Sequence, residues 1–447
     1  MYLAYSLLLS LGLLLFSPYF LFQALAHRKY IDGLRERLGF LPPIDNQPVI
    51  WLHCVSVGET QAARPLVERL RKELPQHALV ISTVTLTGQK LARDLFRAQA
   101  ARVFYFPFDW RWSVRRALDV TNPAVVLVME TELWPNFLRE CKEREIPVAL
   151  VNGRISRKSF GRYLKIRFFL RRVLACLSMA VMQSEKDAGR IRELGMRQDG
   201  VFIAGNLKFE SVGYRDENTD VKERFGLGMG VPLVLAASTH APEEKIVLES
   251  FRRLRTARPV RLMLAPRRPE RFDEVAELIQ GSGLSWARRT IAPAAPDASA
   301  AVILLDTIGE LQAIYSFASV VFVGGSIVDR GGHNVLEPGA HGVAVITGAH
   351  THNFHAIVEG LKDAQAIVQL PPVKGEEAVM ELTEALERLL SEAEWRNELG
   401  HRARELIIKN QGAAERTMKL LAPLFSADHS ENPRSGDSLL PASAHSS

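Results

Sequence analysis

A glutamate that follows a short apolar run is the first residue whose type and setting suggest chemistry. Residues 49–55 are largely apolar and partly β-branched, and the chain then turns through Gly58 and Glu59. Such a run is typical of a buried strand, and open α/β sheets hold ligands at the carboxyl ends of their strands. Gly58 would let a substrate come close. Glu59 is therefore a candidate general base, and the alternative is that it caps the next helix, where a negative charge is favourable.

Two glycine pairs in the second half of the chain form a pattern that can hold a phosphate. The chain reads Gly-Gly-Ser from residue 324 and Gly-Gly-His-Asn from residue 331, and a predicted helix with an early acid follows. Glycines before a helix start can bind a phosphate, and the acid would reach a ribose diol. A lone glycine-rich turn is often only a tight connection, and the spacing matches neither GxGxxG nor a P-loop. The order of the pattern favours a nucleotide site made by Gly325, Gly332, His333, Asn334 and Glu337.

Three more side chains could join this nucleotide site. Arg267 ends another predicted strand of the second half, and a guanidinium group suits phosphate oxygens. The alternative is a surface charge beside a turn. Ser238 ends the first predicted strand of that half, and Lys208 comes just before a predicted linker. We expect Ser238 to point into the same site and Lys208 to supply a cation at the domain junction.

The first half carries acids at a second strand end. Glu130 and Glu132 follow a predicted strand, where they could hold substrate hydroxyls. They could equally be charges at the start of the next helix. The sequence leaves these two interpretations open.

A one-sign basic segment follows these acids. Residues 154–172 hold eight basic residues and no acidic one, with aromatic residues interleaved. Such a run is often a solvated face, but a basic helix with aromatic residues favours anionic lipid head groups, with nucleic acid as the runner-up. Arg154 and Arg162 belong to this segment and are candidate acceptor-binding residues.

Alternating strand and helix patterns predict the elements that would position these residues. The alternation predicts parallel sheets covered on both faces, and residues 216–230, which are polar and glycine-rich, interrupt it. The predicted fold is α/β, with two doubly wound, Rossmann-like domains that face a cleft. The predicted division is a membrane anchor over 1–27, a first domain over 28–215, a linker over 216–230, a second domain with C-terminal helices over 231–425, and a disordered tail over 426–447.

Length and composition agree with a folded, multidomain protein. The chain has 447 residues, a net charge of +6 and three widely spaced cysteines. The odd cysteine count disfavours a disulfide framework and favours a reducing compartment. Neither an HExxH motif nor a paired Cys/His set occurs in the sequence. We therefore expect no tightly bound metal.

The N-terminal segment is strongly apolar. Residues 2–26 contain no charged residue and are long enough to cross a bilayer as a helix. A cleaved signal peptide is the alternative, but no basic residue precedes the apolar run, as a signal peptide requires. The basic residues that follow it predict that the rest of the chain is cytoplasmic. The sequence thus predicts a single-pass or membrane-associated protein.

Many separate motifs together resemble the 3-deoxy-D-manno-octulosonic acid (Kdo) transferases of lipopolysaccharide biosynthesis. The resemblance runs from the apolar segment to about Gly348. One position departs from the family, because Arg268 stands where a histidine is usual. The matching stretches are His53–Glu59, Thr83–Gly88, Pro107–Asp109, Glu130–Asn136, Asn152–Arg154, Gly205–Phe209, Ser238–His240, Pro266–Phe272, Gly324–Ser326 and Gly331–Pro338.

The resemblance implies a GT-B glycosyltransferase that moves Kdo from CMP-Kdo to a lipid A precursor at the inner membrane. Glu59 matches the family's proposed catalytic base, and Glu130 matches an acid of the acceptor site. Arg267 and the stretch that ends at Glu337 match the CMP-binding side. The expected reaction is a single displacement with inversion and without an obligatory metal. The expected partners are CMP-Kdo, the lipid A precursor and anionic lipid head groups, and not nucleic acid.

Two other classes of function remain open on the sequence. One is a GT-B enzyme that uses another nucleotide sugar, or a sugar-nucleotide epimerase, which would need no lipid acceptor. The other is a membrane-tethered lipid-binding protein without activity. The presence of Glu59, Arg267 and Glu337 together favours an enzyme.

Overall fold

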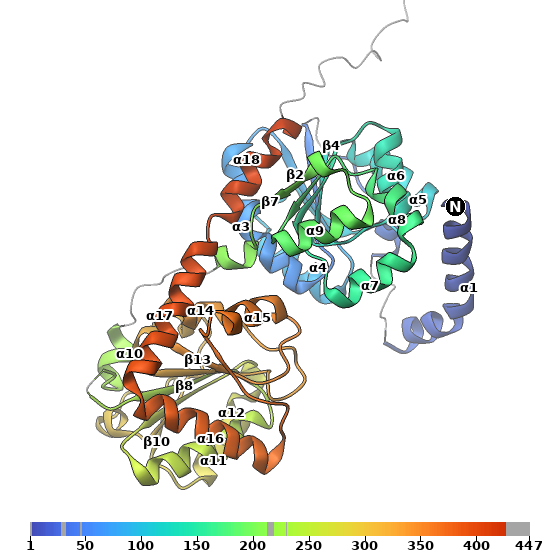
Figure 1. Cartoon of the computed structure of the whole chain (residues 1–447). Coiled ribbons are helices and arrows are strands. Elements are labelled where there is room, and N and C mark those ends of the chain that lie inside the picture. The colour runs from blue at the N-terminus through green and yellow to red at the C-terminus, as the bar shows by residue number, and fades with distance from the viewer. Residues whose placement is uncertain (1, 28–32, 45–46, 212–218, 229, 426–447) are drawn as a thin grey trace, which may run out of the picture. The chain divides into compact units, whose positions relative to one another are not determined.

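The computed structural model describes the chain except for residues 1, 28–32, 45–46, 212–218, 229 and 426–447. The predicted disordered tail and part of the predicted linker therefore lie outside the described residues. The chain divides into two compact units, Met1–Leu207 with Gly412–Ser447 and Lys208–Gln411 (Figure 1). Each unit is described by itself.

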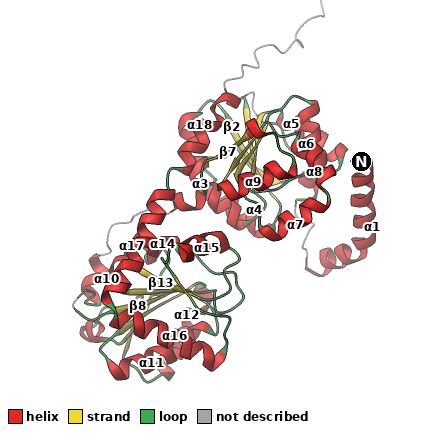
Figure 2. Cartoon of the chain, in the orientation of Figure 1, coloured by secondary structure: helices red, strands yellow, loops and turns green. Residues whose placement is uncertain are grey.

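The first unit is built on a parallel sheet of seven strands among the described residues, in the order β3-β2-β1-β4-β5-β6-β7. Helices cover both faces of this sheet (Figure 2). The strands are β1 Val49–His53, β2 Ala78–Thr83, β3 Arg102–Tyr105, β4 Pro123–Met129, β5 Val148–Gly153, β6 Met179–Met182 and β7 Val201–Ile203. The α-helices are α1 Tyr2–His27, α2 Leu34–Arg37, α3 Val57–Glu73, α4 Leu86–Leu95, α5 Arg111–Thr121, α6 Pro135–Glu143, α7 Arg157–Lys165, α8 Arg167–Leu174, α9 Glu185–Leu194 and α18 Ala413–Phe425.

The second unit repeats this plan with its own seven described strands, in the order β10-β11-β9-β8-β12-β13-β14. The strands are β8 Leu233–Thr239, β9 Arg261–Pro266, β10 Trp286–Arg288, β11 Val302–Leu304, β12 Val320–Val323, β13 Ala344–Thr347 and β14 Val368–Gln369. The α-helices are α10 Thr219–Arg224, α11 Glu243–Ala257, α12 Phe272–Gly281, α13 Leu311–Ile314, α14 Leu336–Ala340, α15 His355–Asp363, α16 Gly375–Ser391 and α17 Ala393–Asn410. Together the two sheets confirm the predicted α/β class with two Rossmann-like domains.

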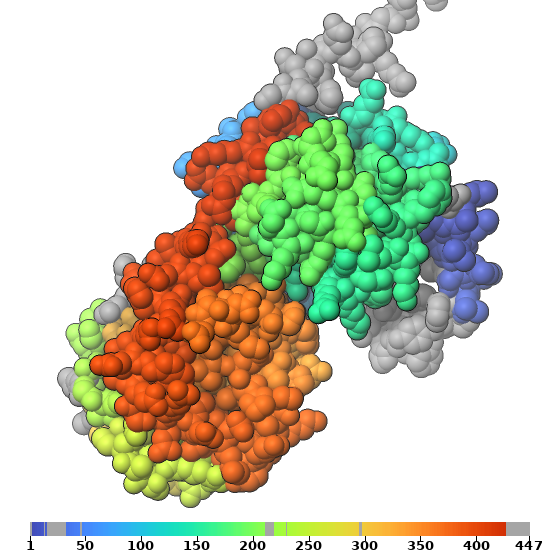
Figure 3. Space-filling view, in the orientation of Figure 1, coloured from blue at the N-terminus to red at the C-terminus, as the bar shows by residue number. Residues whose placement is uncertain are grey.

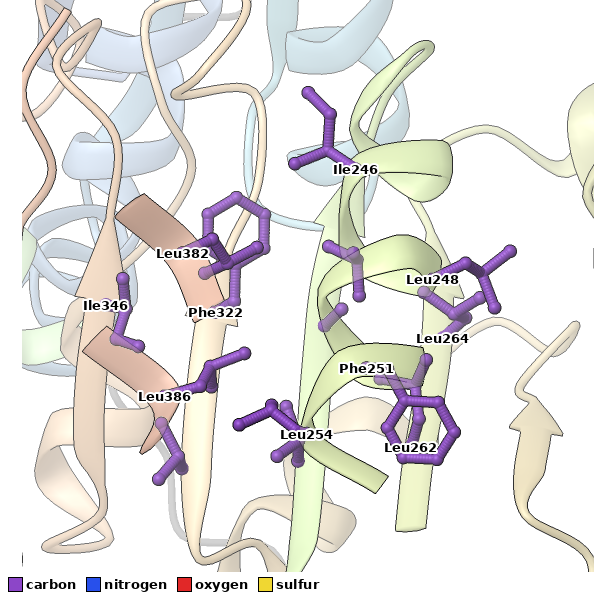
Figure 4. Packing of buried hydrophobic residues seen from close by; sticks show 14 of the residues in the cluster. Ile246, Leu248, Phe251, Leu254, Leu262, Leu264, Phe322, Ile346, Leu382 and Leu386 are labelled. Carbon is purple, nitrogen blue, oxygen red and sulfur yellow. The ribbon is translucent and has the colours of Figure 1, made fainter. Parts of the chain in front are cut away.

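The core of each unit lies on both faces of its sheet. In β1, Val49 and Trp51 face one hydrophobic cluster, and Ile50 and Leu52 face the other. A strand buried on both faces reads as a continuous apolar run, which is why parallel strands were recognisable in the sequence. In the second unit, side chains of α11 and α16 pack on β9, β12 and β13 (Figure 4). The labelled residues of this cluster are Ile246, Leu248, Phe251, Leu254, Leu262, Leu264, Phe322, Ile346, Leu382 and Leu386.

In each sheet, the strand order changes direction beside one strand. In the first unit, β1 lies between β2 and β4, and the chain builds outward from it in both directions. In the second unit, β8 lies between β9 and β12 in the same way. Ligands of open α/β sheets bind at the carboxyl ends of the strands where the order reverses. The loops that follow β1 and β8 are therefore the places to look for a site.

Two boundaries differ from the predicted division. Residues predicted to form a linker include α10, and Val221 and Phe225 are fully buried in the core of the second unit. Val221 and Phe225 are four positions apart, which is the spacing of residues on one face of a helix. The polar residues around them hid this spacing in the sequence. The last helix, α18, belongs to the first unit and not to the second, because Met418 and Leu421 pack in the core beside α3. The Arg416 Nε atom also donates to the Ala204 carbonyl at 2.8 Å.

The N-terminal helix α1 covers the residues that were predicted to form a membrane anchor. No helix among the described residues has the length and apolarity needed to span a membrane. One side of α1 contacts the first unit: the Tyr5 hydroxyl donates to Asp109 at 3.0 Å, and the Asn136 amide donates to the Ser6 hydroxyl at 3.0 Å. Exposed leucines lie along the same helix. They are Leu3, Leu7, Leu8, Leu11, Leu14 and Leu15.

Candidate functional site

Glu59 lies in the first turn of α3, directly after the loop that follows β1. Ser56 precedes the helix as its N-cap residue. One carboxylate oxygen of Glu59 accepts from the Val55 N–H at 2.8 Å, and the other accepts from the Ser56 hydroxyl at 3.1 Å. The helix-capping interpretation is therefore present in the structure, and it does not exclude a chemical role. The side chain is only 7% exposed.

Burial gives the Glu59 carboxyl group an unusual affinity for a proton. Desolvation raises its pKa to about 8, the Val55 N–H opposes this shift, and the charges of Glu130 and Glu132 raise the pKa further. Burial disfavours the charged form of an acid, and nearby like charges do the same. A carboxylate with such a pKa accepts a proton far more readily than an ordinary glutamate. General bases work best when their pKa lies near the working pH.

Glu130 and Glu132 reach Glu59 because their strand is its neighbour in the sheet. β4 pairs with β1 in parallel, with His53 opposite Val128, so both strands end at the same edge. Glu130 takes a left-handed backbone conformation with φ of 53°, which non-glycine residues adopt only at some cost. Burial, and then the charge of Glu130, raises the pKa of Glu132. The two acids thus form one cluster with Glu59 and are not merely isolated charges at a helix start.

The basic residues of the first unit divide between this cluster and the surface. The Thr131 hydroxyl donates to the Arg154 carbonyl, so the backbone of Arg154 lies beside the acidic loop. Arg162 lies on α7, and its guanidinium donates to the Ser159 hydroxyl at 3.3 Å. In the space-filling view, the segments that form α7, α8 and α9 make one continuous face of the first unit (Figure 3). Arg162 is exposed, and its charge and that of Glu132 both act on the neighbouring Tyr163 hydroxyl.

In the second unit, a pair of histidines is the centre of the predicted nucleotide site. The His240 Nε2 and His333 Nε2 atoms lie 2.9 Å apart, and the two rings are stacked with centroids 5.1 Å apart. One ring must donate and the other accept, so the two Nε2 atoms do not both carry a proton in this arrangement. Burial lowers the pKa of His333 to about 4, and the charges of Arg267 and His240 lower it further. Ser238 lies two residues before His240 in the chain and has a left-handed backbone conformation with a φ of 56°.

Arg267 and the glycines of the loop after β12 belong to the same site as the His240–His333 pair. The Arg267 N–H donates to the Thr239 carbonyl at 3.0 Å, which joins the end of β9 to the end of β8. A Cβ atom on Gly325 would lie 2.9 Å from the His333 ring, so only glycine fits there. The Gly332 N–H donates to the Gly325 carbonyl at 2.8 Å. The structure thus brings together Ser238, Arg267, Gly325, Gly332 and His333.

Glu337 and Asn334 adjoin this group. The Asn334 side-chain amide donates to Glu337 at 3.0 Å, and its oxygen accepts from the Leu336 N–H at 3.1 Å. Burial raises the pKa of Glu337, while its hydrogen bonds and the charge of Arg267 lower it. The helix α14 has only five residues and begins at Leu336. Its start is already capped by Asn334, so it offers less to a phosphate than the sequence suggested.

Lys208 is the first residue of the second unit, directly after Leu207 of the first, so along the chain it lies at the junction where it was predicted. Its Nζ atom lies 5.9 Å from the centre of the Phe354 ring. A cation over an aromatic face is favourable, so this contact holds the lysine against α15.

One buried residue beside this group was missed by the sequence analysis. Glu243, in the first turn of α11, is fully buried and accepts N–H bonds from the glycine-rich loop after β12. The loop was expected to direct its N–H groups to a phosphate, but several of them bind this carboxylate instead. The available signal was an acid at the start of a predicted helix that directly follows Ser-Thr-His. Within the described residues there is no cluster of His, Cys, Asp and Glu side chains suited to a metal ion.

Comparison with known proteins identifies the family. Residues 32–211 match the family model described as 3-deoxy-D-manno-octulosonic-acid transferase. The 3-deoxy-D-manno-octulosonic acid transferase of Haemophilus influenzae is 35% identical over 88% of this chain and 92% of its own. The chain belongs to the Kdo transferase family. The transferase of Bordetella pertussis is 34% identical over 86% of this chain and 89% of its own.

Solved structures of low sequence identity show that this chain has a GT-B-like fold. A glycosyltransferase from Rickettsia africae matches with a TM-score of 0.55 at 13% identity, over 86% of this chain and all of the other. A UDP-GlcNAc 2-epimerase from Neisseria meningitidis matches with a TM-score of 0.55 at 13% identity, over 84% of this chain and all of the other. These similarities establish the fold, which transferases and epimerases share, and not the reaction.

Proposed function

We propose that this Kdo transferase moves Kdo from CMP-Kdo to a hydroxyl group of a lipid A precursor, with inversion at the anomeric carbon. The observation that carries the proposal is the buried Glu59 carboxylate, whose pKa is raised to about 8, at the strand end where an α/β sheet holds its ligand. Family membership supplies the sugar that is transferred. The donor CMP-Kdo and the lipid acceptor are part of the proposal.

In the proposed reaction, Glu59 removes the proton from the acceptor hydroxyl as that oxygen attacks the anomeric carbon of Kdo. A new carbon–oxygen bond forms on one face of the sugar, and the bond from the anomeric carbon to the phosphate oxygen breaks on the other. CMP leaves with both electrons of that bond, and the proton stays on Glu59. Glu130, in the same carboxylate cluster, orients the acceptor through its hydroxyl groups, and Arg154 lies beside it.

The second unit would hold the donor. Arg267 and the His240–His333 pair offer cationic and N–H donor groups for the phosphate, and Glu337 offers acceptor oxygens for the ribose. A leaving group with a single phosphate can be stabilised by fixed donors and an arginine. The reaction therefore needs no obligatory metal ion. It needs both units, because the base stands on one and the donor groups stand on the other.

We also propose that the first unit works at the surface of the inner membrane. The exposed leucines of α1 and the basic face of α7 and α8 lie on this unit, and apolar and basic groups together favour an anionic lipid surface. The proposal predicts that the protein co-sediments with phosphatidylglycerol vesicles and is released by salt. Equal binding to neutral phosphatidylcholine vesicles would contradict the electrostatic part.

A donor screen tests the proposed function. The purified full chain is incubated with a tetra-acylated lipid A precursor and, in separate reactions, CMP-Kdo, a UDP-sugar and a GDP-sugar. The expected result is a lipid heavier by Kdo, with release of CMP, in the first reaction alone. Release of UDP or GDP with transfer of another sugar would overturn the choice of donor. Conversion of a UDP-sugar without an acceptor would show an epimerase instead.

A further inference from the structure

The glycine-rich loop after β12 directs its backbone N–H groups toward the protein interior. The Gly325 N–H donates to one oxygen of Glu243 at 2.7 Å, and the Ser326 and Ile327 N–H groups donate to the other at 2.9 Å each. Successive N–H groups of this kind form a concave site for an anion. Here the anion is the protein's own carboxylate.

Glu243 also binds the loop that carries one of the two histidines. The His240 N–H donates to Glu243 at 3.0 Å, to the same oxygen that Gly325 contacts. One carboxylate therefore joins the loop after β8 to the loop after β12. Those two loops carry His240 and Gly325, and Gly325 lies against the His333 ring.

The space around Glu243 leaves no room for a substrate. Glu243 is fully buried, and a Cβ atom on Gly324 would lie only 2.8 Å from its Oε2 atom. Ser326 is also fully buried, and it holds the loop from the other side: its hydroxyl donates to the Val323 carbonyl at 2.6 Å and accepts from the Gly348 N–H at 2.8 Å. The carboxylate can therefore act only through the loops that it holds.

We propose that Glu243 is a positioning residue of the donor site, which fixes the loops after β8 and β12 so that His240, Gly325 and His333 present one preformed surface to the anionic donor. The inference rests on the proposed function, because it concerns the same nucleotide-sugar site. It adds to the site a residue that does not contact the donor. It also assigns phosphate binding to the histidine pair and Arg267, and no longer to the loop N–H groups.

The neighbouring glutamate supplies a matched control. Glu244 is also buried in the first turn of α11, but its carboxylate pairs with Arg271 at 2.7 Å and not with the glycine-rich loop. Glu243→Gln places an NH₂ group where the carboxylate now accepts N–H bonds, so donors meet donors. Glu244→Gln removes a buried charge from the same turn and leaves the loops in place. We expect both variants to be less stable than the wild type, and only Glu243→Gln to displace the loops after β8 and β12.

The experiment measures CMP affinity by calorimetry, KM and kcat for CMP-Kdo, and Tm, for the full chain and both variants. At metal sites, loss of a residue that supports a ligand from behind typically costs about 10- to 100-fold in affinity or activity, and we use this range as the order of magnitude here. We expect Glu243→Gln to raise the Kd for CMP and the KM for CMP-Kdo by about this factor, with a smaller effect on kcat. Glu244→Gln is expected to lower Tm and to keep the wild-type Kd and KM.

Two results would overturn the inference. One is an unchanged Kd and KM in Glu243→Gln, and the other is an equal loss of affinity in both variants, which would indicate general destabilisation. If Glu243→Gln does not fold, Ser326→Ala makes the same test, because it loosens the same loop without touching a charge and is expected to raise the Kd for CMP. An unchanged Kd in that variant would overturn the inference as well. Failure of the wild-type protein to bind CMP or to use CMP-Kdo would instead overturn the proposed function.

Discussion

The two units carry a buried glutamate at equivalent positions, and the two side chains have different surroundings. Glu59 follows β1 and Glu243 follows β8, each in the first turn of the next helix. Glu59 accepts one backbone N–H and one hydroxyl bond, whereas Glu243 accepts close N–H bonds from His240, Gly325, Ser326 and Ile327. The same position of the fold thus holds a carboxylate with few donors in one unit and a carboxylate with many donors in the other.

The number of donors decides what each carboxylate can do. Each N–H bond stabilises the charged form, so Glu243 is held in place by its partners. Glu59 has fewer partners and two acidic neighbours, which raise its pKa together with burial. A carboxylate that is both buried and poorly stabilised gains most from taking up a proton. Burial raises the pKa of both groups, but the N–H bonds of four residues oppose the shift at Glu243. The comparison therefore supports the proposed proton transfer by Glu59 and the proposed positioning role of Glu243.

The largest expected effect is that of removing the Glu59 carboxylate. Glu59→Gln keeps the shape of the side chain and removes the base, and a general base contributes about 10²–10⁴-fold. We expect kcat to fall by at least about that factor, while CMP affinity stays at the wild-type value, because the donor groups lie on the other unit. A control, Glu68→Gln, changes an exposed residue of the same helix that pairs with Arg64 and should leave kcat unchanged. Near-normal turnover in Glu59→Gln would remove Glu59 from the mechanism.

The next effect separates two adjacent arginines of the donor side. A hydrogen bond to a charged group contributes about 1.5–3 kcal/mol, which is about 10- to 100-fold in affinity. We expect Arg267→Ala to raise the KM for CMP-Kdo by this factor. Arg268→Ala should have a smaller effect, because Arg268 lies 3.9 Å from Glu270, whereas the charge of Arg267 acts on His333 and Glu337. Steady-state kinetics of both variants measure the difference, and equal effects would show that Arg267 acts only through surface charge.

A smaller effect tests the influence of the acidic neighbours. The charge of Glu132 raises the pKa of Glu59, so Glu132→Gln should lower that pKa. The pH at which kcat/KM reaches half its maximum should then move down by less than about one unit. Glu68→Gln, with its distant exposed charge, should leave it in place. A midpoint that does not move in Glu132→Gln would show that burial alone sets the pKa of Glu59.

The smallest expected effect is on stability. The pKa of Glu59 is raised from 4.5 to about 8 on folding, so the folded state binds the extra proton. The stability from that proton is complete below the unfolded pKa and is lost as the pH rises through about 8. The Tm of the wild type should therefore fall relative to that of Glu59→Gln between pH 5 and pH 9. A Tm difference that stays constant over this range would contradict the raised pKa.

The fold was largely predictable from the sequence, because strands buried on both faces are continuous apolar runs. Val49–His53 and Val320–Val323 are examples. The sequence also predicted the residues at strand ends, such as Glu59, Arg267 and Ser238, because those positions follow from the order of the elements. The domain boundaries were harder to predict. Polar residues hid Val221 and Phe225, and nothing local indicates that α18 returns to the first unit.

The contacts that define the site could not be predicted from local patterns. The 2.9 Å contact of His240 with His333 joins residues 93 positions apart, and that of Glu243 with Ile327 joins residues 84 apart. The glycine-rich pattern predicted a phosphate site. A sequence shows where glycines leave the backbone N–H groups accessible, but it does not show which acceptor those groups bind. The apolar composition of residues 2–26 predicted a helix, but it did not show the hydrogen bonds that join Tyr5 and Ser6 to Asp109 and Asn136.

The most direct test of the central claim is the pH dependence of kcat/KM for Kdo transfer from CMP-Kdo to the lipid acceptor. The pH profile of kcat/KM reports the ionisations of the free enzyme. We expect a single rising limb with its midpoint near the Glu59 pKa of about 8, and loss of that limb in the residual activity of Glu59→Gln. A midpoint near 4.5, the ordinary value for glutamate, or a limb that persists in Glu59→Gln would contradict it.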